Sequence, residues 1–281
     1  MSCDLPKKHR RRWLRYSLRT WLVVMTVVAV CGGWWCLSVM RQREAVEKMQ
    51  AAGFVVRYDF EWDNVRRNPE CPVPKFLRSL LGVNSYHNVV EFQLPHDPYL
   101  REHVNVAAVR NVLSSLPHLK SLGLRGPASD ADLCLIGRLT DLEFLGLDEL
   151  VATDKGNEKL AHLRNLKWLE LCGPLTDGNV RAISRLPRLE WLTIFDVELS
   201  HHMMAEIGSM TQLISLDLLD CRGISDINYL SNMKQLRHLG MREANPKAQM
   251  PNLRQFEAAM PNCDIEYDLG DRRLYEKHLP E

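Results

Sequence analysis

The feature that most constrains this chain is an apolar motif, apolar-x-x-apolar-x-x-apolar-x-apolar, that occurs six times between Leu116 and Met241. Successive copies start 23, 24, 23, 24 and 23 residues apart, and every motif position is Leu, Ile or Met. The third position of each copy is Leu122, Leu145, Leu169, Leu192, Leu216 and Leu239. A fixed period in the twenties predicts stacked units that bury their apolar edges against one another. Any function is therefore expected on the surface that these units present.

The spacing inside one copy predicts its backbone. The last two apolar positions are two residues apart, so both point to the same side of an extended strand. A polar or Gly/Pro-containing turn follows, and then a Ser or Thr suited to cap a helix, at Ser129, Thr153, Thr176, Ser200 and Ser225. Four of these residues precede an Asp, which suits the first turn of a helix. Each unit is expected to be strand, turn and short helix, with a shorter or frayed helix where Asn157 replaces an apolar residue.

This pattern resembles a leucine-rich repeat, and the segment LDLLDCRGISD is similar to the cysteine-containing subtype. The resemblance implies an α/β solenoid with parallel strands on a concave face and short helices on a convex face. The same subtype occurs in F-box substrate receptors, although this chain has no F-box-like helical segment. An intracellular adaptor role therefore stands as an alternative that depends on the subtype alone.

The repeats are expected to extend at both ends. Val89, Phe92 and Leu94 occur in the same phase as the later copies, 30 residues before Leu119, which predicts an irregular first repeat followed by a helix near residues 104–116. Leu253, Phe256 and the segment MPNCDIEY predict a last helix and a terminal strand, because end repeats must cover the open core. The mostly charged residues 268–281 are expected to form a tail.

Residues 20–40 form an uncharged, apolar segment of 21 residues. As a helix it would be about 31 Å long, enough to cross the hydrocarbon core of a bilayer. Residues 1–19 carry seven basic side chains and one acidic one, which predicts a cytoplasmic N-terminus and extracytoplasmic repeats. Those residues contribute +6 to a net charge of +1, so the remainder carries −5, a poor match for nucleic-acid binding. The basic run is better explained by membrane topology.

A cleaved signal peptide is the main alternative to this signal-anchor helix. The apolar stretch is longer than a typical signal-peptide core and no clear A-x-A site follows it, so an uncleaved anchor is preferred. A lipoprotein centred on Cys31 is disfavoured because Val30 is too large for the position before the cysteine. The domains expected are a basic tail (1–19), the membrane helix (20–40), a juxtamembrane helix, strand and N-terminal cap (41–85), the repeats with a C-terminal cap (86–267), and the charged tail (268–281).

Taken end to end, the basic apolar anchor, the segments AAGFVVRYDFEW and KFLRSLLGVNSYHNVVEFQL, the repeats and MPNCDIEY resemble membrane-anchored leucine-rich-repeat proteins of planctomycete-type bacteria. This resemblance covers nearly the whole chain. It implies an architecture, a single-pass bacterial membrane protein, and specifies little about activity.

No catalytic or metal-binding motif stands out. The eight cysteines are widely spread without a C-x-x-C pair, and small buried residues are the expected role for each. The adjacent His201 and His202 have no carboxylate or cysteine to complete a metal set. Nucleotide-binding, hydrolase and metalloprotease motifs are missing from the sequence. The chain is therefore expected to be non-enzymatic, with no cofactor and no metal.

The candidate binding surface is the concave face of the expected sheet. Side chains between the buried positions align from strand to strand about 4.8 Å apart, which predicts an aromatic ladder of Phe144, Trp168 and Trp191. The residues expected to contact a partner are Phe144, Trp168, Glu170, Trp191, Phe195, Asp217 and Leu219. Contiguous exposed aromatics often mark binding sites, so an unknown protein or surface polymer is the expected ligand. The alternative is a structural envelope component that self-associates through the same patch.

Overall fold

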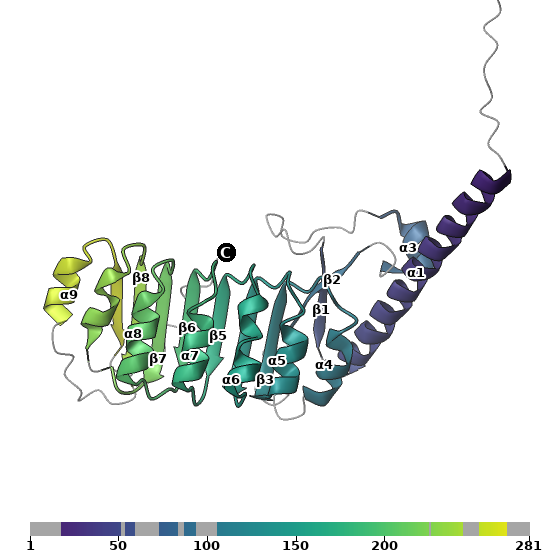
Figure 1. The fold of residues 1–281 in the computed structure, drawn as a ribbon. Coiled ribbons are helices and arrows are strands. Elements are labelled where there is room, and N and C mark those ends of the chain that lie inside the picture. The colour runs from purple at the N-terminus through teal and green to yellow at the C-terminus, as the bar shows by residue number, and fades with distance from the viewer. Residues whose placement is uncertain are drawn as a thin grey trace, which may run out of the picture. The chain divides into compact units, whose positions relative to one another are not determined.

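The computed structural model describes residues 18–51, 54–59, 73–83, 87–93, 106–224, 226–243 and 253–268. The chain divides into two compact units, Met1–Arg41 and Gln42–Glu281, and each is described by itself. A nine-stranded sheet is the framework of the second unit, and its strands lie side by side in chain order from β1 to β9 (Figure 1). The apolar repeats therefore form one sheet.

Strands β2 to β9 pair in parallel, whereas β1 pairs antiparallel with β2. The strands are β1 (Val55–Tyr58), β2 (Val89–Gln93), β3 (Ser121–Ala128), β4 (Phe144–Leu150), β5 (Trp168–Cys172), β6 (Trp191–Phe195), β7 (Ser215–Cys221), β8 (His238–Glu243) and β9 (Asp264–Asp268). The third motif positions are register partners along the sheet, Leu122 with Leu145, then Leu169, Leu192, Leu216 and Leu239. Phe92 pairs with Leu122, which confirms the irregular first repeat.

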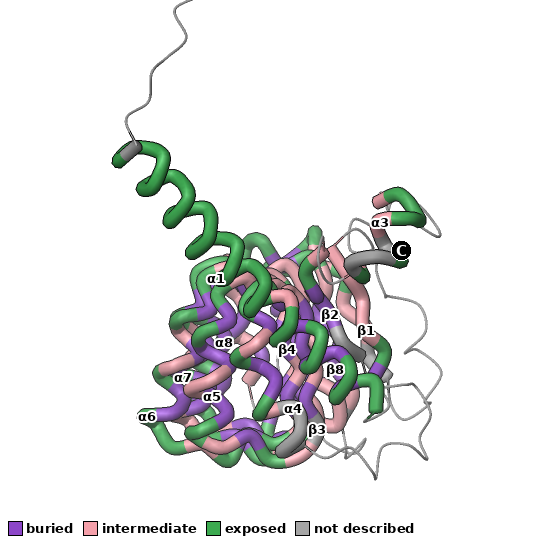
Figure 2. The backbone as a smooth tube through the Cα atoms, turned by 90° about the vertical axis from the view of Figure 1, so that its right-hand side faces the viewer, coloured by how far each residue is buried: buried purple, intermediate pink, exposed green. Residues whose placement is uncertain are grey.

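The helices between the repeat strands lie on one face of the sheet (Figures 1 and 2). They are α4 (Val106–Leu113), α5 (Asp130–Ile136), α6 (Asp154–Asn157), the 3₁₀ helix η3 (Leu160–His162), α7 (Asp177–Ile183), α8 (His201–Ser209), the 3₁₀ helix η4 (Ile227–Asn232) and α9 (Leu253–Ala259). Helix α3 (Lys75–Leu81) precedes β2. The opposite face of the sheet, formed by the strand residues that alternate with the buried positions, is called the open face below.

The core follows the motif closely. All 24 motif positions are buried, and the most exposed of them, Leu124, keeps only 5% of its surface. Burying a large apolar side chain contributes about 1.5–3 kcal/mol, an upper estimate because unfolded chains already bury part of their surface. Leu122, Leu145, Leu169 and Leu192 line this common interior with no exposed surface. The repeat motif is therefore the principal source of stability in the second unit.

The predicted capping residues occupy the expected positions. Ser129, Thr153, Thr176 and Ser200 are the N-cap residues of α5, α6, α7 and α8. The fifth cap differs: Asp226 caps η4 and accepts the backbone N–H of Asn228, while Ser225 lies outside the described residues. The side-chain oxygens of Thr176 and Ser200 accept the backbone N–H groups of Asn179 and Met203 at the start of their helices. Ser129 and Thr153 hold the N-cap position without a side-chain cap hydrogen bond.

The Asp that follows a cap also joins neighbouring units, a role that the sequence reasoning did not include. Asp130 accepts hydrogen bonds from both the backbone N–H and the hydroxyl of Thr153, each at 2.7 Å. Asp177 accepts the hydroxyl of Ser200 at 2.7 Å. Gly156, in the next unit, leaves room for the carboxylate of Asp130, because a Cβ atom at that position would force Asp130 to shift. At these two steps along the helical face, the cap of one unit is hydrogen-bonded to the Asp that follows the cap of the unit before it.

Asn157 marks the one unit whose α-helix has only four residues and continues as η3. Its side chain is 1% exposed, and neither its amide nitrogen nor its amide oxygen has a hydrogen-bond partner among the residues that the structure describes. The equivalent positions in other units are the fully buried Leu133, Val180 and Met204. The expectation of a short helix in the unit that contains Asn157 is confirmed.

The first end of the sheet is closed by the C-terminal part of helix α1 (Leu18–Ala51) and by β1. Ala45, Val46 and Met49 are buried in the core, and Gln42 donates its side-chain amide to the carbonyl oxygen of His87 at 2.7 Å. Strand β1 covers the free edge of β2. The sequence predicted this strand but not its antiparallel pairing.

The first unit contains the N-terminal part of α1, which begins at Leu18. Its apolar side chains are exposed, from Trp21 to Met40, and Trp34 keeps 77% of its surface. In the described part of the chain, one helix, Arg19–Ala51, is long and apolar enough to cross a membrane. A signal sequence near an N-terminus satisfies the same criterion. The basic residues 1–17 and the tail from residue 269 on lie outside the described residues.

Candidate interaction surface

All seven residues predicted to contact a partner lie in strands β4 to β7 and alternate with buried positions. Phe144 pairs in register with Trp168, and Trp168 with Trp191, so the three aromatics form one row across β4, β5 and β6. Phe195 pairs with Leu219 in a second row. Glu170 and Asp217 stand on either side of the buried Thr193 in the row between them. The strand register thus brings the predicted residues onto one face.

The aromatic row is less regular than a continuous stack. Phe144 and Trp168 make an edge-to-face contact with ring centroids 5.4 Å apart and an interplanar angle of 89°. Among the described residues, no ring contact joins Trp168 to Trp191. Trp191 is 37% exposed, whereas the indole N–H of Trp168 is buried and has no hydrogen-bond partner. The expected ladder therefore consists of one packed pair and one separate, accessible tryptophan.

A partly buried carboxylate lies beside this aromatic pair. Burial raises the pKa of Glu170, and the nearby negative charges of Asp148 and Asp217 raise that pKa further. Within the described part of the chain, Glu170 makes no hydrogen bond and no ion pair. Desolvation and like charges both disfavour an ionised carboxylate. The surroundings of Glu170 therefore disfavour the ionised form of its carboxyl group.

The neighbouring strands β7 and β8 carry acidic groups that are paired. Asp217 lies 3.2 Å from Nε2 of His238, and this hydrogen bond, although opposed by burial, raises the pKa of His238. Asp220 accepts two hydrogen bonds from Arg242, at 3.0 and 2.7 Å. Asp217 and Asp220 therefore have basic partners on β8, whereas Glu170 on β5 is paired with no described residue.

One group of potential metal ligands, missed from the sequence, lies at this end of the sheet. Ligand atoms of His238, Asp264 and Glu266 all lie within 4.8 Å of one another. The parallel register of β8 and β9 produces the group by pairing His238 with Asp264 and Gly240 with Glu266. Aligning the terminal strand with β8 in the sequence would have revealed it. The hydrogen bond to Asp217 raises the pKa of His238, and the charges of Glu266 and Asp264 raise it further, so the imidazole of this group is already paired with a carboxylate.

Within the described ranges, the other histidines and cysteines belong to no group of potential metal ligands. His201 and His202 are both exposed at the start of α8, and no metal-ligand group among the described residues includes them. Cys221 is fully buried, and burial raises its pKa to about 12. Its thiol lies 3.5 Å from the carbonyl oxygen of Ile194. The six cysteines that the structure describes are free thiols, whereas Cys3 and Cys71 lie outside the described residues.

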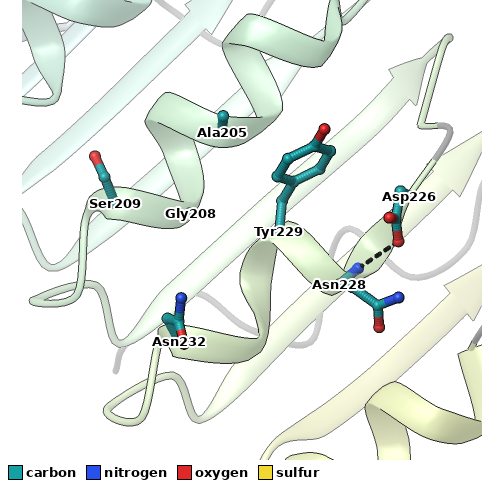
Figure 3. Close-up of a pocket in the computed structure, with 7 residues that line it drawn as sticks. All are labelled: Ala205, Gly208, Ser209, Asp226, Asn228, Tyr229 and Asn232. Atoms are coloured by element: carbon teal, nitrogen blue, oxygen red, sulfur yellow. Dashed lines mark hydrogen bonds between the residues drawn. The ribbon is translucent and has the colours of Figure 1, made fainter.

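An open pocket of about 400 Å³ lies on the helical side, between α8 and η4 (Figure 3). It is lined by Ala205, Gly208, Ser209, Asp226, Asn228, Tyr229 and Asn232. Its one charged side chain, Asp226, already accepts the backbone N–H of Asn228. The pocket therefore lacks the convergent acid, base and nucleophile of an active site.

No family model matches this chain, and no curated protein matches it either. Among solved structures, an internalin of Listeria monocytogenes is similar at 19% identity and a TM-score of 0.41, covering 60% of this chain and 52% of that one. A leucine-rich-repeat protein of Leptospira interrogans is similar at 17% identity and a TM-score of 0.39, covering 56% and 46%. A protein of Bacteroides fragilis is similar at 17% identity and a TM-score of 0.37, covering 60% of this chain and 54% of that one.

The chain spans about half the length of these three structures. Its own leucine-rich-repeat-like arrangement rests on the strand register and on the burial of the repeat motif.

Proposed function

We propose that this chain is a membrane-anchored leucine-rich-repeat solenoid whose open, concave face binds another protein outside the cytoplasm. The observation that carries the proposal is the row of Phe144, Trp168 and Trp191 across three neighbouring strands. Large aromatic side chains dominate the binding energy of many protein interfaces. The described residues offer no comparable set of catalytic groups, so the protein acts by binding.

The second row of the open face supports the same proposal. Phe195 and Leu219 add apolar surface next to the aromatic row, and both are partly exposed. Asp217 lies beside them with its charge directed to His238. An apolar centre with charged groups at its edge is the usual arrangement of a protein-binding patch.

The anchor is proposed to be uncleaved, with the N-terminus in the cytoplasm. The apolar part of α1 is long enough to span a bilayer, and the basic residues 1–19 favour the cytoplasmic side. We expect the mature protein to retain its N-terminus and to stay in the membrane during carbonate extraction. A soluble product that begins near Gly32 would contradict the anchor. Protection of the repeats from protease added to intact cells would instead support the intracellular adaptor.

Photo-crosslinking in native membranes tests the binding face. A photoreactive amino acid replaces Trp191, which is 37% exposed and is not needed for the buried core. We expect a discrete crosslinked protein from this position and none from the matched control position Lys155, which is exposed on the helical side. Equal crosslinking from both positions, or from neither, contradicts the proposal. A crosslink to a second copy of this chain would support the self-associating envelope component instead.

A further inference from the structure

The last three strands bring one histidine and three carboxyl groups together on the open face. In one row of open-face positions, Asp217 on β7 pairs in register with Gly240 on β8, and Gly240 pairs with Glu266 on β9. In the neighbouring row, His238 on β8 pairs with Asp264 on β9. The parallel register therefore surrounds one imidazole with carboxyl groups from both adjacent strands.

Gly240 leaves the space in which the histidine meets its partner. Nε2 of His238 lies 3.2 Å from Oδ1 of Asp217. A Cβ atom at position 240 would lie 3.3 Å from that Nε2 and would collide with the carboxylate of Asp217. On the other side, one side-chain nitrogen or oxygen of each of His238, Asp264 and Glu266 lies within 4.8 Å of the other two. The missing side chain at Gly240 thus allows one imidazole to connect β7 with β9.

These carboxyl groups favour the protonated form of His238. The hydrogen bond with Asp217 raises the pKa of His238, burial opposes this effect, and the negative charges of Asp217, Glu266 and Asp264 raise the pKa further. The side chain of His238 keeps only 21% of its surface, so solvent screens these charges incompletely. Among the described residues, the three carboxyl groups are the charged groups that face the imidazole from β7 and β9. On β8 itself, Arg242 is hydrogen-bonded to a different residue of β7.

Strand β9 closes the second end of the apolar core. It is the last strand of the described sheet and pairs along the edge of β8. Ile265 packs against the core, and Phe256 and Met260, which precede the strand, are buried in that core. An uncovered strand edge can pair with another chain. The contacts that hold β9 therefore decide whether this end of the sheet stays covered.

We propose that protonated His238 holds the terminal strand β9 against β7 and β8, and that deprotonation of His238 loosens this strand. In the protonated state, one positive charge lies between Asp217 on one side and Asp264 and Glu266 on the other. After deprotonation, three carboxylates remain and repel one another. The inference is independent of what the open face binds.

The direction of the pH dependence follows from the pKa of His238, which is raised in the folded state. The stabilisation is fully present below the ordinary histidine pKa of about 6.5 and is lost as the pH rises through the raised value. Strand β9 is therefore held most firmly in mildly acidic surroundings.

Hydrogen–deuterium exchange of the full chain in nonionic detergent tests this proposal, read by mass spectrometry on peptides that contain residues 264–268. Each variant is compared with the wild type at the same pH, so the intrinsic exchange rate cancels, and EDTA in all buffers excludes metal ions. At about pH 5.5, His238→Gln should speed the exchange of β9 amides about three- to tenfold, because it removes a charge-assisted contact. At about pH 9 the two proteins should exchange alike, because His238 is then neutral in the wild type.

His118→Gln is the matched control. His118 also pairs with an aspartate, Asp141, at 3.0 Å, but the two side chains keep 57% and 46% of their surface and belong to the first repeats, so β9 should be unaffected. Gly240→Ala is the second variant, which retains every charged group but pushes the carboxylate of Asp217 away from His238. It should also speed β9 exchange at about pH 5.5, and it tests the proposal even if His238→Gln fails to fold.

Three outcomes would overturn the proposal. One is an unchanged rate of β9 exchange at about pH 5.5 in either His238→Gln or Gly240→Ala. The second is an equal acceleration by His238→Gln at both pH values, which would show a structural role of the side chain without a contribution from its charge. The third is an equal effect of His118→Gln on β9.

Discussion

Replacing Asn157 should stabilise the protein, although most substitutions of buried residues destabilise. The side chain of Asn157 is 1% exposed, and both of its polar atoms lack hydrogen-bond partners. A buried polar group without a partner costs about 1–3 kcal/mol. Asn157→Val removes that cost and places at this position the residue found at the equivalent, fully buried Val180. We therefore expect the free energy of unfolding to rise by about 1–3 kcal/mol.

Urea unfolding followed by circular dichroism measures this change, and thermal unfolding should show a rise of about 2–4 °C per kcal/mol for a unit of this size. Asn179→Val is the matched control. Asn179 is equally buried, but its side-chain oxygen accepts the backbone N–H and the hydroxyl of Thr176, at 2.6 and 2.9 Å. The control removes these two hydrogen bonds but leaves the Thr176 cap in place, and it should lose about 1 kcal/mol. A loss of more than 1 kcal/mol in Asn157→Val would refute the reasoning, because it would mean that the amide is hydrogen-bonded.

Three further results are expected. Leu169→Ala, at a fully buried position in the centre of the sheet, should cost about 2.7–5 kcal/mol in urea unfolding, and a cost below 1 kcal/mol would contradict the shared core. Glu170→Gln should raise the melting temperature at pH 7 but not below about pH 4. The pKa of Glu170 is raised in the folded state, so the wild type loses stability as the pH rises through that pKa, whereas glutamine stays neutral. An unchanged melting temperature at pH 7 would count against this explanation. Cys221 has a pKa of about 12 and no exposed surface, so it should resist iodoacetamide at pH 8 in the folded protein and react after unfolding. Modification of Cys221 in the native state would contradict its burial in the core.

The features that follow the repeat period could be predicted from the sequence. Leu122, Leu145 and Leu169 had to be strand neighbours once one unit was recognised, because the same spacing recurs in every copy. The helix caps at Ser129 and Thr176 follow from local backbone chemistry. The short helix at Asn157 could be predicted because a single polar residue interrupts a regular apolar position.

The features that depend on contacts between units could not be derived from the period. The hydrogen bonds from Thr153 to Asp130 require the distance between two caps, which the repeat length alone does not provide. The lack of a ring contact between Trp168 and Trp191 depends on side-chain rotamers, which neighbouring residues determine. The grouping of His238 with Asp264 depends on the register of an irregular terminal strand.

The central claim is that the aromatic row on the open face contacts a protein partner. The most direct measurement uses the partner protein that is crosslinked at position 191. Its affinity is compared between the wild type and the triple variant Phe144→Ser, Trp168→Ser and Trp191→Ser, and the urea midpoint of the variant checks that it is folded. Loss of several interface aromatics should weaken binding by more than about thirtyfold, the equivalent of about 2 kcal/mol. Unchanged affinity in a folded triple variant would contradict the account.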